Sequence, residues 1–168
     1  LIVHSAAISS TIISCDAAAL TRRDLEQNLE QLDHNNQVRL LMGSIMPADA
    51  YLKAIKLREL LRRQILDALT KVDVLVMPTS SIPAPKIPEK AGVESKEEVL
   101  EGFRGRRSFT SPFNLANTPA LSICCGFTSE VLPVGLQIVG KPFAESTVFK
   151  VAYGYQSITD WHTQRPKI

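Results

Sequence analysis

The sequence predicts an α/β fold, in which a mixed, partly parallel sheet is flanked by helices. Short apolar runs bounded by Pro or Gly occur at residues 72–77, 121–124 and 134–139, as expected for strands. Segments with helical spacing at residues 47–71 and 144–159 alternate with these runs, which favours strand–helix units. The chain has 168 residues, 45% hydrophobic and 21% charged, so its composition is that of an ordinary globular protein with a sizeable core.

The first quarter of the chain predicts helices separated by polar breaks. Residues 6–20 are rich in Ala and Ile and favour a helix. Thr21 followed by Asp24 resembles an N-cap with an acidic third position. The polar residues 34–36 predict a break, and residues 43–47 predict a second one whose proline suits the first turn of a new helix.

The clearest helix is predicted for residues 47–71. Apolar residues recur there every three or four positions and form one predicted buried face: Tyr51, Ala54, Leu57, Leu61, Ile65, Ala68 and Leu69. At about 100° per residue, Arg58 falls inside this apolar face. A guanidinium in such a place is costly unless it is paired. Arg58 is therefore expected to bind either a structural carboxylate or a substrate.

The segment after this helix predicts a strand and then a long connection. Residues 72–77 read V-D-V-L-V-M and favour a strand buried on both faces. Prolines crowd residues 78–88 and forbid regular structure, whereas residues 95–98 form a capping box that predicts a short helix. A connection of this length is expected to act as a lid or pocket wall, from Pro83 to about Arg107.

Composition and motif content exclude several function classes. The net charge of +2 is too small to predict direct contact with nucleic acid or an anionic membrane, and no apolar run approaches the ~20 residues of a membrane span. Cys15, Cys124 and Cys125 with scattered histidines provide neither a disulfide framework nor metal-ligand spacing. Cys125, far in sequence from any histidine, is expected to be a buried structural thiol. We expect a cytoplasmic protein without metal or organic cofactor.

Three segments carry most of the information about function. Residues 110–126 read T-S-P-F-N-L-A-N-T-P-A-L-S-I-C-C-G, and residues 133–140 read P-V-G-L-Q-I-V-G. With V-D-V-L-V-M-P-T at residues 72–79, they resemble in order and spacing the C-terminal motifs of the amidase signature family, serine enzymes that cleave C–N amide bonds. Asn117 stands where that family usually has Gly, and Asn is the non-Gly residue that best tolerates positive φ. Cys124 stands where Pro is common.

The resemblance implies an acyl-enzyme mechanism with a nucleophilic Ser, a second Ser and a Lys base. The family's nucleophile lies in a Gly-Ser-rich loop whose N–H groups surround the oxyanion. Neither Ser9-Ser10 nor Ser80-Ser81 lies in such a loop. Because the first residues also lack an initiator Met and a basic stretch, the chain reads as a cut through a longer polypeptide. We therefore expect residues 1–168 to form a single partial domain, inactive alone, with the triad upstream of Leu1.

The resemblance also implies four substrate-binding candidates: Arg58, Arg107, Thr110 and Asn114. In the glutamine amidotransferase branch, the helix residue corresponding to Arg58 holds the substrate carboxylate in a bidentate contact. That branch has Asp at the position of Arg107, and an Arg cannot accept a hydrogen bond from an ammonium group. The difference favours a general amidase over a glutamine-donating subunit. Asn114 is expected to hold loop backbone more than substrate, and for Thr110 both readings stay open.

Two alternatives to the amidase interpretation stay open. The chain could be a free-standing, non-catalytic remnant that binds a small acid or a partner through Arg58, or a fragment of a tRNA-dependent glutamine amidotransferase subunit. The partners expected are a small amide substrate and the N-terminal half of the same enzyme, with no nucleic acid and no membrane. A cut sheet would leave an open edge and exposed apolar surface, so self-association, including a homodimer, is predicted.

Overall fold

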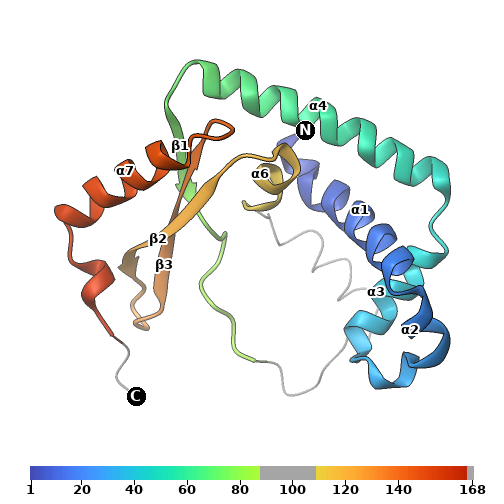
Figure 1. Ribbon diagram of the computed structural model, residues 1–168. Coiled ribbons are helices and arrows are strands. Elements are labelled where there is room, and N and C mark those ends of the chain that lie inside the picture. Colours follow the sequence, from blue (N-terminus) through green and yellow to red (C-terminus); the bar gives the residue numbers. More distant parts are fainter. Residues whose placement is uncertain (88–108, 166–168) are drawn as a thin grey trace. The chain divides into compact units, whose positions relative to one another are not determined.

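The computed structural model describes residues 1–87 and 109–165. The chain divides into two compact units, one built on Leu1–Leu60 and the other on Leu61–Pro85 and the described residues from 109 onwards. Figure 1 shows the elements of each unit. The expectation of a single partial domain stays a prediction. The capping box at residues 95–98 and most of the predicted lid fall outside the described residues.

The first unit is helical. Its elements are a 3-10 turn at Ile2–His4, α1 at Ser5–Leu20, α2 at Arg22–Gln27, a 3-10 turn at Leu29–Gln31, α3 at His34–Ser44 and the first half of α4, Ala48–Thr70. Helix α1 confirms the helix predicted for residues 6–20, and it packs against α3 (Figure 1). The buried apolar residues of α1 and α3 are Ile8, Ile12, Ala18 and Leu40.

Glycine at position 43 permits the close approach of α3 to α1. A Cβ added there would overlap the carbonyl oxygen of Ser14 and would lie 2.5 Å from its carbonyl carbon. Because backbone atoms cannot swing aside as a flexible side chain can, any larger residue would force the two helices apart. Gly43 therefore sets the spacing of this helix pair.

Two local predictions in the first unit were wrong. Residues 34–36 do not form a break, because the Asp33 side chain accepts hydrogen bonds from the N–H groups of Asn35 and Asn36, at 3.1 and 3.2 Å, and caps the start of α3. Thr21 does not cap α2, because its hydroxyl donates to the carbonyl of Ala17 at 2.8 Å instead.

One helix is more apolar than expected from the sequence, where no apolar run approached the length of a membrane span. Ile2–Leu20 has 19 residues and a mean hydropathy of 1.3, which is long and apolar enough to cross a membrane by length and composition alone. Core helices of soluble proteins pass the same test, and this helix buries Ile8, Ile12 and Ala18 within its unit. The length and composition of this helix are therefore only weak evidence for a membrane span.

Helix α4 confirms the strongest helical prediction. Its buried residues follow the predicted spacing of three or four positions: Ala54, Leu61, Ile65 and Leu69. Asp49 lies in the first turn, where the positive end of the helix dipole favours a carboxylate. The helix ends at Thr70, just before the first strand.

The second unit contains a three-stranded sheet with the order β1-β3-β2. Its elements are β1 at Val74–Pro78, α6 at Ser111–Ala116, β2 at Ala120–Phe127, β3 at Pro133–Gly140, α7 at Glu145–Ser157 and a 3-10 turn at Trp161–Thr163. Helix α7 packs against the sheet around one apolar cluster (Figure 1). That cluster contains Ile123, Ile138, Val148 and Ala152, with Val74, Leu121, Leu136 and Tyr155 packed against it.

The α/β class is confirmed, but the described pairings are not parallel. Both β1–β3 and β2–β3 are antiparallel. Strands β2 and β3 are joined by residues 128–132, and so short a link makes a hairpin, whereas a parallel crossover needs a dozen or more residues. Strand β1 lies at one edge of the described sheet and is half-buried to exposed, so the prediction that it is buried on both faces was also wrong.

Candidate functional site

Two hydroxyl groups from different strands meet over a glycine in the second unit. Thr79, directly after β1, and Ser122 of β2 share a hydrogen bond with an Oγ1–Oγ distance of 2.6 Å. The Thr79 N–H donates to the carbonyl of Gly135 on β3 at 2.8 Å. A Cβ at Gly135 would lie 2.7 Å from the Thr79 oxygen and 2.9 Å from the Ser122 oxygen. The hydroxyl pair therefore requires glycine at this position, and these contacts tie the residue after β1 to both β2 and β3.

A buried glutamine connects the sheet to the segment that begins α6. Gln137 of β3 is 3% exposed, and its Nε2 donates to the carbonyl of Phe109 at 3.0 Å. The next carbonyl, that of Thr110, accepts from the N–H groups of Phe113 and Asn114, both at 3.2 Å. Gln137 is buried on a strand that alternates polar and apolar residues, because its amide holds this backbone.

The end of α6 confirms one expectation from the sequence. Asn117 has φ 55° and ψ 49°, the left-handed conformation that ends the helix. The chain then passes Pro119, whose carbonyl accepts from the N–H of Gly140 at 2.9 Å. A Cβ at Gly140 would lie 2.6 Å from Val148 Cγ2, so this glycine lets α7 pack closely on β3.

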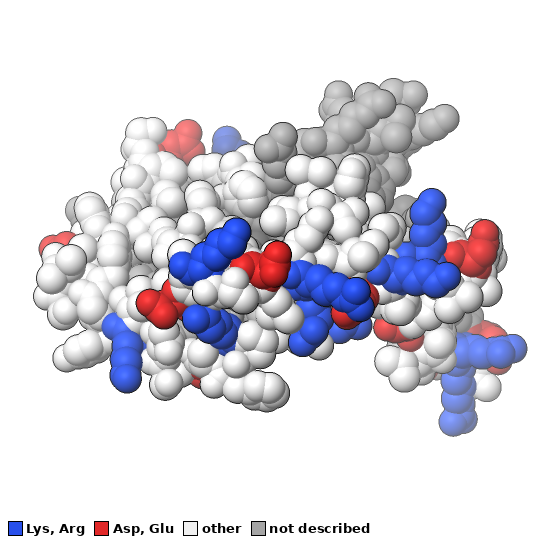
Figure 2. Space-filling model, turned by 90° about the horizontal axis from the view of Figure 1, so that it is seen from above, with Lys and Arg blue, Asp and Glu red and all other residues white. Residues whose placement is uncertain are grey.

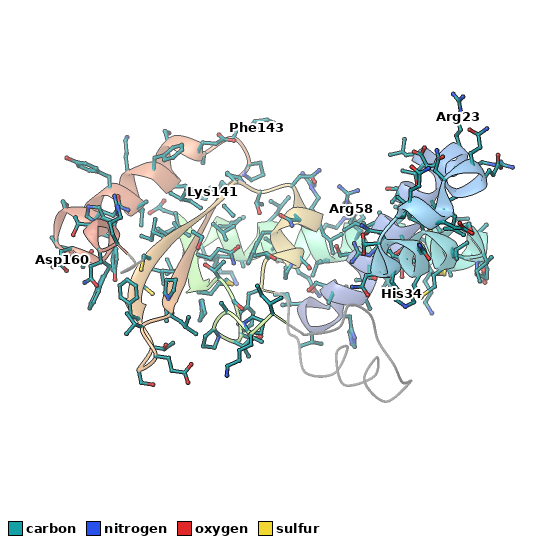
Figure 3. All side chains as sticks on the ribbon, turned by 90° about the horizontal axis from the view of Figure 1, so that it is seen from below. Arg23, His34, Arg58, Lys141, Phe143 and Asp160 are labelled. Atoms are coloured by element: carbon teal, nitrogen blue, oxygen red, sulfur yellow. The ribbon has the colours of Figure 1, made fainter. Side chains whose placement is uncertain are left out.

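The four predicted substrate-binding residues fall in different places. Thr110 and Asn114 come together, one just before α6 and one within it, and both are exposed. Arg58 is half-buried on α4 and belongs to the first unit (Figure 3). Arg107 lies outside the described residues. Thr79, Ser122 and Gln137 were not named as site residues, although each stands in one of the three motif segments.

Arg58 lies near a tyrosine that joins α4 to α1. The Tyr51 hydroxyl donates to Asp16 Oδ1 at 2.9 Å. This hydrogen bond raises the pKa of Tyr51 above its ordinary value, with smaller contributions from burial and from the Asp16 charge, while the positive charge of Arg58 acts in the opposite direction. Arg58 is therefore close enough to Tyr51 to influence its ionisation, two helical turns further along α4.

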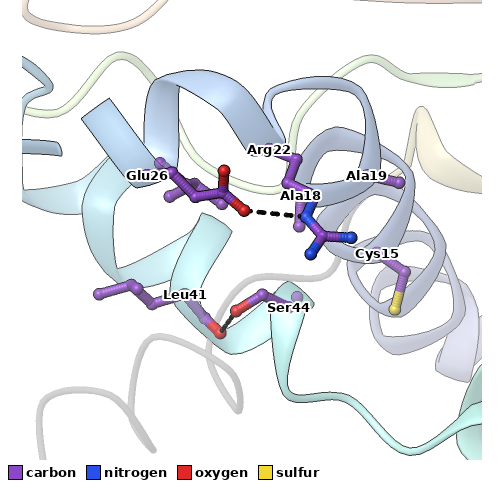
Figure 4. A pocket seen from close by; sticks show the side chains of 9 residues that line it. Cys15, Ala18, Ala19, Arg22, Glu26, Leu41 and Ser44 are labelled. Carbon is purple, nitrogen blue, oxygen red and sulfur yellow. Dashed lines mark hydrogen bonds and ion pairs between the residues drawn. The ribbon is translucent and has the colours of Figure 1, made fainter. Parts of the chain in front are cut away.

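A hollow of about 570 Å³ in the first unit is lined by residues of α1, α2 and α3 (Figure 4). Its charged residues are Arg22 and Glu26, which form an ion pair at 3.0 Å with side chains 81% and 60% exposed. Such an exposed pair contributes little binding energy. On the face shown in Figure 2, acidic and basic side chains are interspersed, and the described residues contain no cluster of His, Cys, Asp or Glu that could hold a metal ion.

Ser80, the first residue of the Ser80-Ser81 pair, stabilises a local turn. Its Oγ donates to the carbonyl of Ile82 at 2.7 Å and accepts from the N–H of Ile82 at 3.3 Å. This is the way a serine hydroxyl stabilises a loop after a strand.

The family model for amidases matches residues 6–149, which covers parts of both units and all three motif segments. The chain belongs to the amidase family. A glutamyl-tRNA(Gln) amidotransferase subunit from Methanosarcina mazei is 47% identical over 116 residues, which are 69% of this chain and 23% of that protein. The corresponding subunit from Moorella thermoacetica is 44% identical over 118 residues, 70% of this chain and 23% of that protein.

Solved amidase structures share the fold. The crystal structure of an amidase superposes with a TM-score of 0.79 at 24% identity, covering 95% of this chain and 36% of the other. The glutamyl-tRNA(Gln) amidotransferase subunit from Thermotoga maritima gives a TM-score of 0.67 at 28% identity, covering 94% and 33%. The chain thus spans less than a quarter of the length of the curated relatives named above and about a third of each solved structure.

The glutamine contact gives a first prediction. Changing Gln137 to Leu is expected to lower the free energy of unfolding by about 1–3 kcal/mol, because the Phe109 carbonyl loses its donor. Changing it to Glu removes the same donor at nearly constant size and should be at least as costly. Urea denaturation gives the stability, and limited proteolysis near Phe109 reports whether the start of α6 has loosened. Unchanged values for both variants would show that the contact is dispensable.

The tyrosine contact gives a prediction about pH. Because the pKa of Tyr51 is raised, the link to Asp16 contributes fully below the ordinary value of 10.0 and is lost as pH rises through the raised value. Changing Asp16 to Asn is expected to lower the pKa of Tyr51. The near-ultraviolet absorbance of tyrosinate measures this pKa. The chain has only three tyrosines, so the contribution of Tyr51 is a large part of the signal. Tyr51→Phe serves as the control and should remove the high-pH component; an identical titration curve in Asp16→Asn would contradict the assignment.

Proposed function

We propose that this chain is the C-terminal portion of a serine amidase that hydrolyses a C–N amide bond through an acyl-enzyme. Family membership supports amide chemistry. The observation that carries the proposal is the position of α6: Gln137 holds the carbonyl of Phe109 just before this helix, and Thr110 and Asn114, at its start and within it, are exposed. A rigidly held helix start with exposed polar side chains suits the wall of a substrate pocket.

The proposed chemistry divides between this chain and the rest of the protein. A serine hydroxyl attacks the amide carbon, the amine leaves with a proton, and water then hydrolyses the ester. We assign the nucleophile, the second serine and the lysine base to polypeptide outside these residues, and the acyl-binding wall to this chain. Arg58, Arg107, Thr110 and Asn114 are the substrate-binding residues of the proposal. The chemistry needs an oxyanion hole and no cofactor.

The test compares the 168-residue chain with the longer protein that contains it, using simple aryl amides as substrates. We expect turnover and covalent labelling by a sulfonyl fluoride only in the longer protein, with the labelled serine outside this chain. Turnover by the 168-residue chain alone would refute the division of roles. A longer protein that neither turns over amides nor takes the label would favour a non-catalytic binding protein instead.

Sequence identity to the curated relatives favours a second candidate function. The curated relatives named above, at 47% and 44%, are subunits of glutamyl-tRNA(Gln) amidotransferases, so this chain could belong to a subunit that takes ammonia from glutamine. Arg107 argues against this alternative. At its position that branch needs a side chain that accepts a hydrogen bond from the ammonium group of glutamine, and an Arg cannot accept one. Ammonia release from free glutamine distinguishes the two: the hydrolase proposal expects none above background, and the amidotransferase alternative expects glutaminase activity.

A further inference from the structure

Strand β2 contains an irregularity at two adjacent cysteines. The pairing with β3 runs from Cys124 opposite Gly135 directly to Gly126 opposite Val134, which leaves Cys125 as an extra residue. In a regular strand, adjacent side chains point to opposite faces of the sheet. A bulge breaks this alternation and can re-aim a side chain, so the two thiols are not forced apart.

Each sulfur atom contacts a carbonyl oxygen of the same residue pair, the one that follows the bulge. Cys124 Sγ lies 3.5 Å from the carbonyl oxygen of Gly126, and Cys125 Sγ lies 3.5 Å from that of Val134. Gly126 and Val134 are the pair that face each other directly after the bulge. Both thiols are free and half-buried, so the expectation that Cys125 is a buried structural thiol was wrong about its burial.

The electrostatics agree with this placement. Burial is the main cause that raises the pKa of the Cys125 thiol, and the charge of Cys124 raises it further. Both groups have only weak partners, because a thiol is a poor donor to a carbonyl.

We propose that Cys124 and Cys125 form a two-sulfur binding site for soft, thiophilic centres, of which trivalent organoarsenicals are the ligand class. The arsenic of a monosubstituted arsenous acid, R–As(OH)₂, exchanges both hydroxyl groups for sulfur. Each thiol proton leaves with one hydroxyl group as water, and two As–S bonds form without any change of oxidation state. Soft sulfur ligands select such centres over hard cations.

The site has a spectroscopic reporter within its own unit. Phe127, two residues beyond Cys125 on β2, lies against Trp161 with a ring-centroid distance of 6.2 Å and an interplanar angle of 57°. Trp161 is the only tryptophan in the chain. Joining both sulfurs through one atom holds the bulge in a single conformation, so we expect the emission of Trp161 to change on binding.

The experiment titrates phenylarsine oxide into the longer protein that contains this chain and, separately, into the 168-residue chain. In the 168-residue chain we expect one arsenical per chain by mass spectrometry and the loss of two of the three titratable thiols. The adduct should survive millimolar monothiol and be removed by a small dithiol, as expected for two As–S bonds. Tryptophan emission of the 168-residue chain should change with the same stoichiometry.

Three variants locate the site. Cys15→Ser is the matched control and should bind as the unsubstituted chain does. Cys124→Ser and Cys125→Ser each leave one sulfur of the pair, so their adducts should be stripped by monothiol; circular dichroism shows whether these variants are folded. Absence of a monothiol-resistant adduct in the Cys15→Ser chain overturns the proposal, whatever the other variants do. The readout is independent of amide turnover, so it stands or falls separately from the proposed function.

Discussion

Replacing Gly43 with alanine is expected to destabilise the first unit by about 3 kcal/mol, at the upper end of what overpacking usually costs. The added methyl group would overlap the carbonyl oxygen of Ser14 and lie 3.1 Å from the Cβ of Ala18. Relief requires that α1 and α3 separate, which also exposes the apolar residues buried between them. Helix propensity favours alanine over glycine by up to about 1 kcal/mol, so the steric effect must exceed that gain.

Gly154 is a matched control for this prediction, because it is also a glycine within a helix. It is exposed on α7, and a Cβ there meets nothing within 4 Å. Gly154→Ala is therefore expected to be neutral or to stabilise by about 0.5–1 kcal/mol, the usual gain in a helix. Urea denaturation followed by far-ultraviolet circular dichroism compares the two variants. If Gly43→Ala were as stable as Gly154→Ala, the close crossing of α1 and α3 would be wrong.

The elements of this fold were predicted well where a local pattern determines them. The periodicity of α4 and the apolar runs of β1, β2 and β3 each depend on neighbouring residues, and the structure confirms them. The break expected at residues 34–36 shows where local patterns fail. These polar residues form the first turn of a helix, because the Asp33 side chain caps it. Parallel pairing was expected from the order of elements, but strand direction depends on which edges meet, and the short link 128–132 was the signal to follow.

The candidate site was less accessible to sequence reasoning. The motifs contain Thr79, Ser122 and Gln137, but their order along the chain does not reveal that two hydroxyls meet over Gly135. An alternating strand normally places polar side chains in water, so the local pattern does not indicate that Gln137 is buried. Its true role requires the carbonyl of Phe109, which is 28 residues away in sequence. Contacts of this kind become visible only when the strands are paired.

Substituting Arg58 with alanine in the longer protein is expected to lower kcat/KM roughly 10- to 100-fold for amides whose acyl part carries a carboxylate. That range corresponds to the about 1.5–3 kcal/mol of a hydrogen bond to a charged group. The prediction rests on the proposed function and on the place of Arg58, half-buried on α4 and within electrostatic reach of Tyr51. Steady-state kinetics on a carboxylate-bearing amide and on its neutral analogue measure the effect.

Selectivity between the two amides decides what Arg58 does. Arg58 has interactions within the structure, so alanine also removes a structural contact, and loss of activity alone would not identify a substrate-binding residue. A structural role lowers turnover of both amides together with stability, whereas a role in binding lowers only the carboxylate-bearing one. Arg58→Lys keeps the charge but not the bidentate fork and should restore activity only partly. Arg63→Ala, exposed on the same helix, should change neither rate. Equal losses for both amides in Arg58→Ala would assign Arg58 to the scaffold and leave the substrate carboxylate without its proposed partner.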